Sequence, residues 1–332
     1  VVAKPIIMRS ENKYVMKKIT TILVFSLFAL TTFAQQEQQY TQFIYNKLSI
    51  NPGYAGSHES ACLTGFYRNQ WIGLEGAPKT MGLSFDMPLL NKRVGVGMNL
   101  VRNTIGITDR WTMDGMYSYR IPLGRGTMSL GVQGSVRYIG NDYGDSRLLA
   151  TQPIGIDGSI PVGEQSKYVP NFGAGMYYSS DKFYFGVSAP RILLNNIDFN
   201  SEEGITLGKE AVHLYGMVGV IFKLSESVKF QPQMLLKYAD NSPFDMDINA
   251  SLIFNNKYTA GLTYRAGGGK TGFGESIDLL LSAHLTPHIL LGVSYDITLS
   301  ELKEYNSGSL ELVLRYCFGS PEGEDIINPR FF

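Results

Sequence analysis

The chain has 332 residues, and its 29 lysines and arginines balance its 29 aspartates and glutamates, so its net charge near pH 7 is zero. Nucleic-acid-binding domains usually carry a basic excess, so this balance argues against a nucleic-acid partner. Glycine (36), tyrosine (20) and phenylalanine (18) are abundant, whereas charged residues make up only 17%. No run of about 20 apolar residues follows residue 34, so any membrane insertion after that point must use strands.

The first 34 residues have the features of an export signal. Lys17 and Lys18 form a basic start, residues 19–33 form an uncharged apolar core, and residues 32–34 form a small-residue cleavage site. We therefore expect export with cleavage near residue 34 and Met16 as the initiator. The alternative is that the apolar run remains uncleaved as a membrane anchor.

Residues 39–59 precede the first expected strand and do not alternate between apolar and polar. Aromatic residues, paired amides and an Asn51-Pro52-Gly53 turn indicate a folded segment. We expect a lead-in domain, 35–59, that packs into or under the periplasmic mouth of a second domain, 60–332. The alternative is a disordered tail. The apolar anchors of the lead-in are Tyr40, Phe43, Tyr45, Leu48 and Ile50.

Residues 60–332 repeat about ten alternating apolar and polar residues followed by a turn, which is typical of a transmembrane β-barrel. A soluble sandwich also alternates, but here the pattern recurs in nearly every strand and the apolar faces often end in an aromatic residue. We predict an all-β fold, an antiparallel barrel of about 14 strands. The expected strands are 62–71, 80–87, 93–101, 111–121, 127–138, 168–179, 182–189, 211–222, 228–238, 244–254, 258–266, 275–285, 289–299 and 309–318.

The connections between these strands alternate in length. Outer-membrane barrels have short periplasmic turns and longer external loops. Counted from a periplasmic start, every second connection is tight, and the others are longer except 239–243. This alternation predicts that both termini are periplasmic. The longest external loops are 141–167 and 191–210, followed by 266–274 and 300–308.

Residue types that carry chemistry are scattered. The histidines, at His58, His213, His284 and His288, lack metal-ligand spacing, so we assign them structural roles. The glycine-rich run 267–271 resembles a phosphate-binding loop only superficially, because no helix follows it. We expect no enzymatic activity, no metal and no cofactor.

Several charged residues lie on the polar side of the alternation, and facing lipid would cost an arginine about 2–4 kcal/mol. Arg102 lies near a strand end. We expect the others to pair with one another and fill the lumen; the alternative is the selectivity lining of a pore. The residues expected in the lumen are Asp114, Arg120, Arg137, Arg265, Asp278, Glu311 and Arg315.

The two longest external loops contain apolar residues where a solvated loop would be polar, and such patches usually mark contacts. We therefore expect a partner-binding site there; the alternative is that these residues fold inward and plug the barrel. They are Leu148, Leu149, Ile154, Ile156, Ile160, Ile192, Leu193 and Leu194.

The two cysteines lie at the start of the first strand and the end of the last. In a closed barrel these strands are neighbours. Cys62 and Cys317 should therefore face each other in the lumen at the periplasmic rim, about 4.5–5.5 Å apart at Cβ, so that a small adjustment allows a disulfide. The alternative is two unrelated buried thiols.

The region from residue 39 to residue 80 and the chain's end resemble the PorP/SprF family, outer-membrane proteins of the Bacteroidetes type IX secretion and gliding systems. Gly53 stands where many relatives have alanine. The resemblance rests on Gln39, Tyr40, Gln42, Phe43, Asn46, Asn51, Pro52, Tyr54, Ala55, Gly56, Arg68, Gln70, Trp71, Gly76, Ala77, Pro78 and Thr80, and on residues 315–318 and 328–331.

This resemblance implies an accessory of type IX secretion. Such a barrel binds an exported cargo, often a large adhesin, through the cargo's C-terminal domain, works with other secretion components, and helps to retain the cargo at the cell surface. The first alternative is a transporter of hydrophobic small molecules resembling the FadL family, which also has about 14 strands and an N-terminal hatch with an Asn-Pro turn; a continuous apolar pocket in the lumen would favour it. A general porin is the second alternative.

Overall fold

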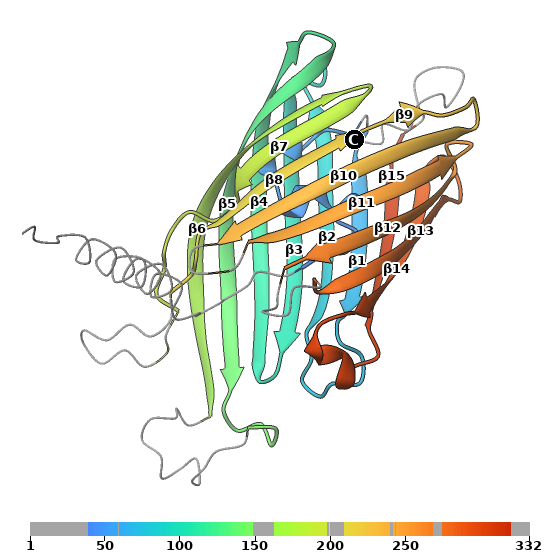
Figure 1. The fold of residues 1–332 in the computed structure, drawn as a ribbon. Coiled ribbons are helices and arrows are strands. Elements are labelled where there is room, and N and C mark those ends of the chain that lie inside the picture. Colours follow the sequence, from blue (N-terminus) through green and yellow to red (C-terminus); the bar gives the residue numbers. More distant parts are fainter. Residues whose placement is uncertain are drawn as a thin grey trace, which may run out of the picture.

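The computed structural model describes residues 39–319, except 59, 149–162, 198, 200–208, 240–241, 243 and 268–273. Its strands form one antiparallel sheet that closes on itself (Figure 1). The short β9 (Phe222–Lys223) continues β8 (His213–Val220), and both pair with β10. The 15 labelled strands therefore make a closed barrel of 14 strands, as predicted. The expected export signal lies outside the described residues.

Each predicted strand is present. The other strands are β1 (Cys62–Asn69), β2 (Lys79–Leu89), β3 (Val94–Ile105), β4 (Thr108–Leu123), β5 (Gly126–Asp142), β6 (Glu164–Ser180), β7 (Phe183–Ala189), β10 (Val228–Ala239), β11 (Asp245–Phe254), β12 (Tyr258–Ala266), β13 (Ser276–His284), β14 (Ile289–Thr298) and β15 (Ser309–Cys317). Of the described residues, none belongs to a helix long and apolar enough to cross a membrane.

The connections separate the barrel into two ends. We call the end that carries the connections 90–93, 124–125, 181–182, 224–227, 255–257 and 285–288 the turn end, and the opposite one the loop end. One expected loop is missing, because β3 and β4 continue to a tight turn at 106–107. β4, β5 and β6 are also longer than predicted, so this wall reaches farther at the loop end (Figure 1).

The two faces of the sheet differ as the alternation predicted. Outward side chains such as Met113, Val132 and Leu281 are more than half exposed, and exposed apolar residues of this kind cover the barrel. Soluble proteins rarely expose such a surface, which suits the hydrocarbon core of a bilayer. The charged residues expected in the lumen do point inward, and all are buried except Arg315, which is partly buried.

The ring closes where β1 pairs with β15. Cys62 is directly opposite Cys317 in this register, as closure requires, with 4.1 Å between the Cα atoms. The two residues form a disulfide at the turn end of the barrel. Both termini of the sheet therefore lie at the same end.

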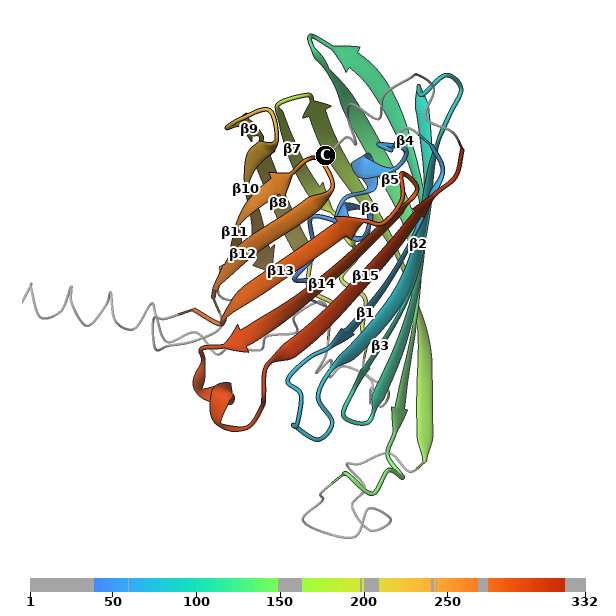
Figure 2. The ribbon, with the colours of Figure 1, turned by 90° about the vertical axis from the view of Figure 1, so that its right-hand side faces the viewer.

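Residues 39–58, which we call the luminal segment, lie inside the barrel (Figure 2). The expected anchors Tyr40, Phe43, Leu48 and Ile50 are buried, and Tyr45 is partly buried. The segment holds two short 3-10 helices, η1 (Lys47–Ser49) and η2 (Pro52–Tyr54). Phe43, Leu48 and Tyr54 pack with Tyr177 and Tyr184 of the wall in one apolar cluster.

The luminal segment reaches from one end of the lumen toward the other. Gln39 donates to Asp245 and Glu275, which lie at the loop end, whereas Gly56 and His58 contact Asp86 near the turn end. The segment therefore runs through the lumen from the loop end to the turn end, and does not sit beneath the turn-end mouth. The polar residues at its start donate hydrogen bonds to buried carboxylates near the loop end, which need such partners because they have lost their hydration.

Candidate functional site

An ionic cluster holds the start of the luminal segment. Arg68 lies 2.7 Å from Asp296 and 3.1 Å from Glu311. The carboxylate of Glu311 also accepts the backbone N–H groups of Thr41 and Gln42, at 2.8 and 2.9 Å. Since these charges are almost completely buried, each depends on its partners to compensate lost hydration.

The cluster continues along the same wall. Arg265 lies 2.9 Å from Asp247, 3.6 Å from Asp278 and 3.7 Å from Asp296. Lys237 adds a contact of 2.8 Å to Asp247. The structure thus unites the predicted Arg265, Asp278 and Glu311 with Arg68, Asp296, Asp247 and Lys237. Asp296 was missed, although it lies on the polar side of the alternation in β14.

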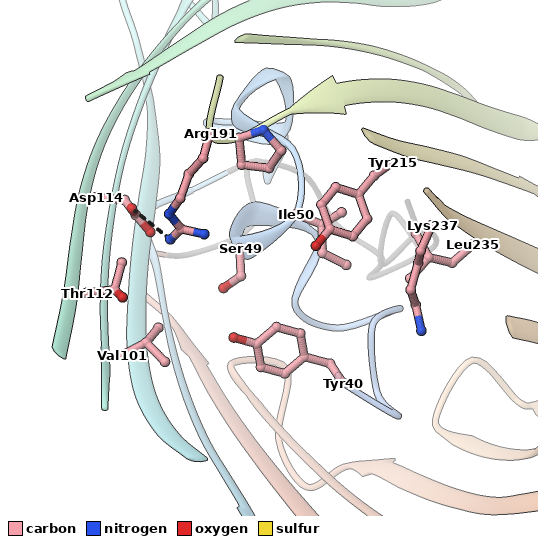
Figure 3. A pocket seen from close by; sticks show the side chains of 11 residues that line it. Tyr40, Ser49, Ile50, Val101, Thr112, Asp114, Arg191, Tyr215, Leu235 and Lys237 are labelled. Carbon is pink, nitrogen blue, oxygen red and sulfur yellow. Dashed lines mark ion pairs between the residues drawn. The ribbon is translucent and has the colours of Figure 1, made fainter. Parts of the chain in front are cut away.

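A second group of ion pairs lies in the opposite wall. Arg137 contacts Glu210 at 2.9 Å, and Arg191 contacts Asp114 at 3.6 Å. Figure 3 shows Arg191 pointing into the lumen toward Asp114, beside Ser49 and Ile50 of the luminal segment. The cavity between them has a volume of about 30 Å³. The described luminal side chains therefore leave little space here.

Glycines in the wall accept the backbone of the luminal segment. A Cβ atom at Gly95 would overlap the carbonyl of Ala55, and one at Gly131 would overlap Pro52. At Gly175 it would overlap the side chain of Asn51, which donates to Met176 O at 2.9 Å. Alanine at these positions would therefore displace the segment.

Lys47 is a buried cation of the luminal segment, outside the membrane-spanning strands. Its Nζ lies 4.3 Å from the ring centroid of Tyr184 and 5.7 Å from that of Tyr54. The ion pairs among the described residues do not include it. Burial, with a smaller contribution from Arg315, lowers the pKa of Lys47 from 10.5 to about 7.

This shift predicts a pH-dependent stability. Between pH 7 and 10.5 the Lys47 amine is protonated in the unfolded chain and neutral in the folded chain, so the free energy of unfolding rises with pH in that window. Below pH 7 the amine is charged in both states, and the full cost of burying its charge lowers the stability of the folded barrel. Lys47→Met should stabilise the barrel at neutral pH by a few kcal/mol. Thermal unfolding midpoints of both proteins at several pH values test this. A stability difference that does not shrink toward pH 10.5 contradicts it.

The predicted partner residues lie partly within the described structure. Ile192, Leu193 and Leu194 are 47%, 42% and 62% exposed. Asn171 fixes their backbone, because its Oδ1 accepts the N–H groups of Ile192 and Leu193 at 3.0 and 2.9 Å. Leu148 is partly buried. Leu149, Ile154, Ile156 and Ile160 lie outside the described residues.

A larger groove opens at the loop end of β1 to β6. It has a volume of about 970 Å³ and lies between the β1–β2 loop, the β3–β4 turn and the ends of β5 and β6. Most of the residues that carry the family resemblance lie in one of two places. Those up to Gly56, with Arg68 and Thr80, are buried in the lumen, whereas Trp71, Gly76 and Ala77 line this groove.

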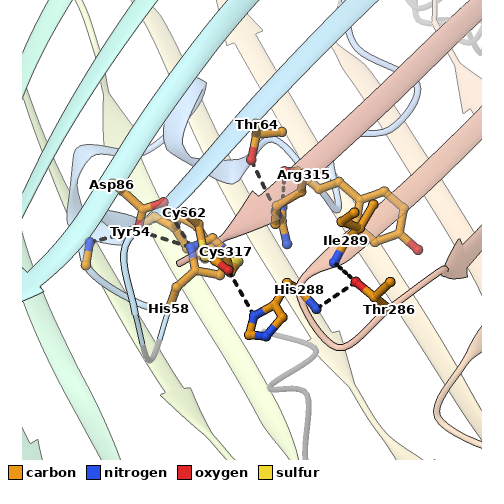
Figure 4. The surroundings of a disulfide bond; sticks show 12 residues. Tyr54, His58, Cys62, Thr64, Asp86, Thr286, His288, Ile289, Arg315 and Cys317 are labelled. Atoms are coloured by element: carbon orange, nitrogen blue, oxygen red, sulfur yellow. Dashed lines mark hydrogen bonds and ion pairs between the residues drawn. A yellow bond between two sulfur atoms is a disulfide. The ribbon is translucent and has the colours of Figure 1, made fainter. Parts of the chain in front are cut away.

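The described residues contain no group of three potential metal ligands. His58 lies 2.9 Å from Asp86, and the ring of His288 is hydrogen-bonded to Cys317 O near the disulfide (Figure 4). His213 contacts Ala211 O. Beside the disulfide, Arg315 donates to Thr64 and to the carbonyl of Tyr45.

A closed barrel with an apolar outer face and a filled polar lumen is an outer-membrane β-barrel protein. The family model described as "Type IX secretion system membrane protein PorP/SprF" matches residues 32–316. The chain therefore belongs to the PorP/SprF family, as the resemblance indicated. A comparison with curated proteins gives no match.

Solved structures share the barrel architecture at low identity. The CymD monoaromatic hydrocarbon channel is 11% identical, with 87% of this chain and 95% of that chain covered and a TM-score of 0.48. The P. putida toluene transporter TodX is 8% identical, with 82% and 93% covered and a TM-score of 0.48. Omp33 of Acinetobacter baumannii is 8% identical, with 78% and 98% covered and a TM-score of 0.44.

Proposed function

We propose that this protein is an outer-membrane accessory of type IX secretion that binds an adhesin-like exported protein through that protein's C-terminal domain. In this proposal the signal is cleaved near Ala34, the turn end is periplasmic and the loop end faces outward. The barrel supports secretion of its cargo, or its anchoring at the cell surface, together with other secretion components. Family membership supports the secretion role.

The observation that carries the docking role is the filled lumen beneath a rigid, apolar loop. Asn171 holds Ile192 and Leu193 in one backbone conformation while their side chains remain exposed. A preformed apolar surface loses little conformational entropy on binding. A transporter of hydrophobic molecules would need a continuous apolar passage, but the luminal cavity beside the segment is only about 30 Å³ and is lined in part by Asp114, Arg191 and Lys237.

Replacing Ile192, Leu193 and Leu194 with serine is expected to reduce cargo recovery about tenfold or more, because truncated side chains at the centre of an interface cost over about 1 kcal/mol each. The backbone contacts to Asn171 remain, so the loop should keep its shape. The measurement is affinity isolation of the barrel from its native cells, with mass spectrometry of surface proteins that carry the type IX C-terminal domain.

The matched control is Leu90→Ser with Leu224→Ser, which removes two exposed leucines at the turn end. This variant should recover cargo as the unmodified protein does. Equal recovery from the triple variant would exclude this loop as the docking site. A cell that lacks the barrel and still retains all its surface proteins would exclude the docking function itself.

A further inference from the structure

The groove at the loop end of β1 to β6 has the dimensions of a protein-binding surface. Its lining includes 25 described residues and its volume is about 970 Å³. Stable protein interfaces involve about 20–30 residues on each side, so the lining has the size of one side of such an interface. This groove is open along six strand ends, so an extended polypeptide fits it better than a compact ligand.

Hydrogen bonds on both sides fix the wall that the β1–β2 loop contributes. Ile72 exchanges backbone hydrogen bonds with Gly308 (2.8 Å) and Ser307 (2.7 Å) of the β14–β15 loop. On the other side, Gly106 N donates to Gly76 O at 2.8 Å, and Gly76 has the positive φ of 72° that favours glycine. The groove is therefore formed before any partner arrives, which lowers the entropic cost of binding.

The groove carries an excess of negative charge. Five carboxylates line it against three cations, an excess of two. Two of the cations are already paired within the groove, because Arg102 contacts Asp109 at 2.8 Å and Arg147 contacts Asp145. The hydrogen bond from Arg147 lowers the pKa of Asp145 to about 2, so this pair stays ionised.

The remaining lining charges are one cation and three carboxylates. They are Lys79 and the carboxylates Glu75, Asp142 and Glu164, and the ion pairs among the described residues include none of these four. Glu75 and Glu164 are exposed. Trp71 and Tyr138 add aromatic surface to the lining. Such a surface attracts a chain in which basic and apolar side chains alternate, and charge complementarity would also raise the association rate.

We propose that this groove binds an extended, lysine- or arginine-bearing segment of the exported protein. The proposal rests on the proposed function and adds to it a second contact, separate from the apolar loop. The apolar loop supplies hydrophobic surface, whereas the groove selects for positive charge. The groove also explains why part of the family resemblance lies on the β1–β2 loop and not in the lumen.

The test uses the full purified barrel in detergent and a short fluorescent peptide in which lysine and valine alternate. A peptide with glutamate in place of lysine is the control ligand. Glu75→Gln with Glu164→Gln should weaken binding of the lysine peptide about tenfold. Glu301→Gln with Glu304→Gln removes two exposed carboxylates from the same end outside the groove, and should change the affinity less than about twofold.

Binding of the lysine peptide that is lost only in the groove variant supports the proposal. Equal binding of the glutamate peptide, or equal loss in the Glu301 and Glu304 variant, overturns it, because the effect would then be a general surface property. If the peptide does not bind while cargo recovery stays normal, the groove proposal fails and the docking function stands. If the peptide binds but cells without the barrel retain their surface proteins, the docking function fails and the groove remains a peptide site.

Discussion

Replacing Arg68 with methionine should detach the start of the luminal segment from the wall. Arg68 is 1% exposed and contacts Asp296, Glu311 and the hydroxyl of Thr41. Without it, two buried carboxylates remain close together, and Arg265 at 3.7 Å from Asp296 is the nearest remaining cation. Removing one partner of a buried ion pair costs about 3–5 kcal/mol.

The measurement is amide hydrogen exchange of the folded barrel. The N–H groups of Thr41 and Gln42 donate to Glu311, so they should exchange roughly a hundredfold faster or more in the variant. Glu311→Gln changes one atom and should act in the same direction, which provides a test if the Arg68 variant does not insert.

Arg102→Met is the matched control, because it removes an arginine paired with Asp109 on the outer surface, where both side chains are over a third exposed. Exposed pairs contribute about 0–1 kcal/mol. Unchanged exchange at Thr41 and Gln42 in both the Arg68 and Glu311 variants would show that the ionic cluster does not hold the segment.

Removing the disulfide should lower the stability of the barrel by about 2–5 kcal/mol. The bond joins residues 255 positions apart, so it restricts most of the unfolded chain. Cys62→Ala with Cys317→Ala should lower the temperature at which the barrel loses its compact form on a gel. Reductant should lower that temperature in the unmodified protein and leave the variant unchanged.

Thiol labelling of the denatured, unreduced protein provides a separate check. Two labelled cysteines together with insensitivity to reductant would show that the bond is absent in the cell envelope. The register of β1 against β15 would still place the two residues opposite each other.

The strands were predictable because each barrel strand faces lipid on one side and the polar lumen on the other. In β5, Leu130 and Val132 face outward while Ser129 and Gln133 face the lumen, and this alternation is visible in the sequence itself. A closed barrel pairs its first strand with its last, and Cys62 and Cys317 lie at the start and end of these strands. Their position opposite each other could therefore be predicted from the sequence alone.

The path of the luminal segment could not be derived in the same way. It has no alternation, and its partners come from strands on opposite sides of the ring, such as Glu311 and Met176. The inward glycines Gly95, Gly131 and Gly175 were visible as gaps in the polar face. Which backbone fills each gap depends on the folded chain. The groove was missed for a related reason, since the loop contacts that fix its walls join distant parts of the sequence.

The filled lumen also determines the order in which the protein can be assembled. The luminal segment precedes β1 in the chain, and it contacts β14 and β15 as well as β4, β5 and β6. A completed ring offers no free passage through which a folded segment of this size could enter. The sheet must therefore curl around the segment, and the pairing of β1 with β15 is the last step. The disulfide lies across this last pairing, so a Cys62–Cys317 bond in the native register of β1 and β15 reports a barrel whose segment is already inside.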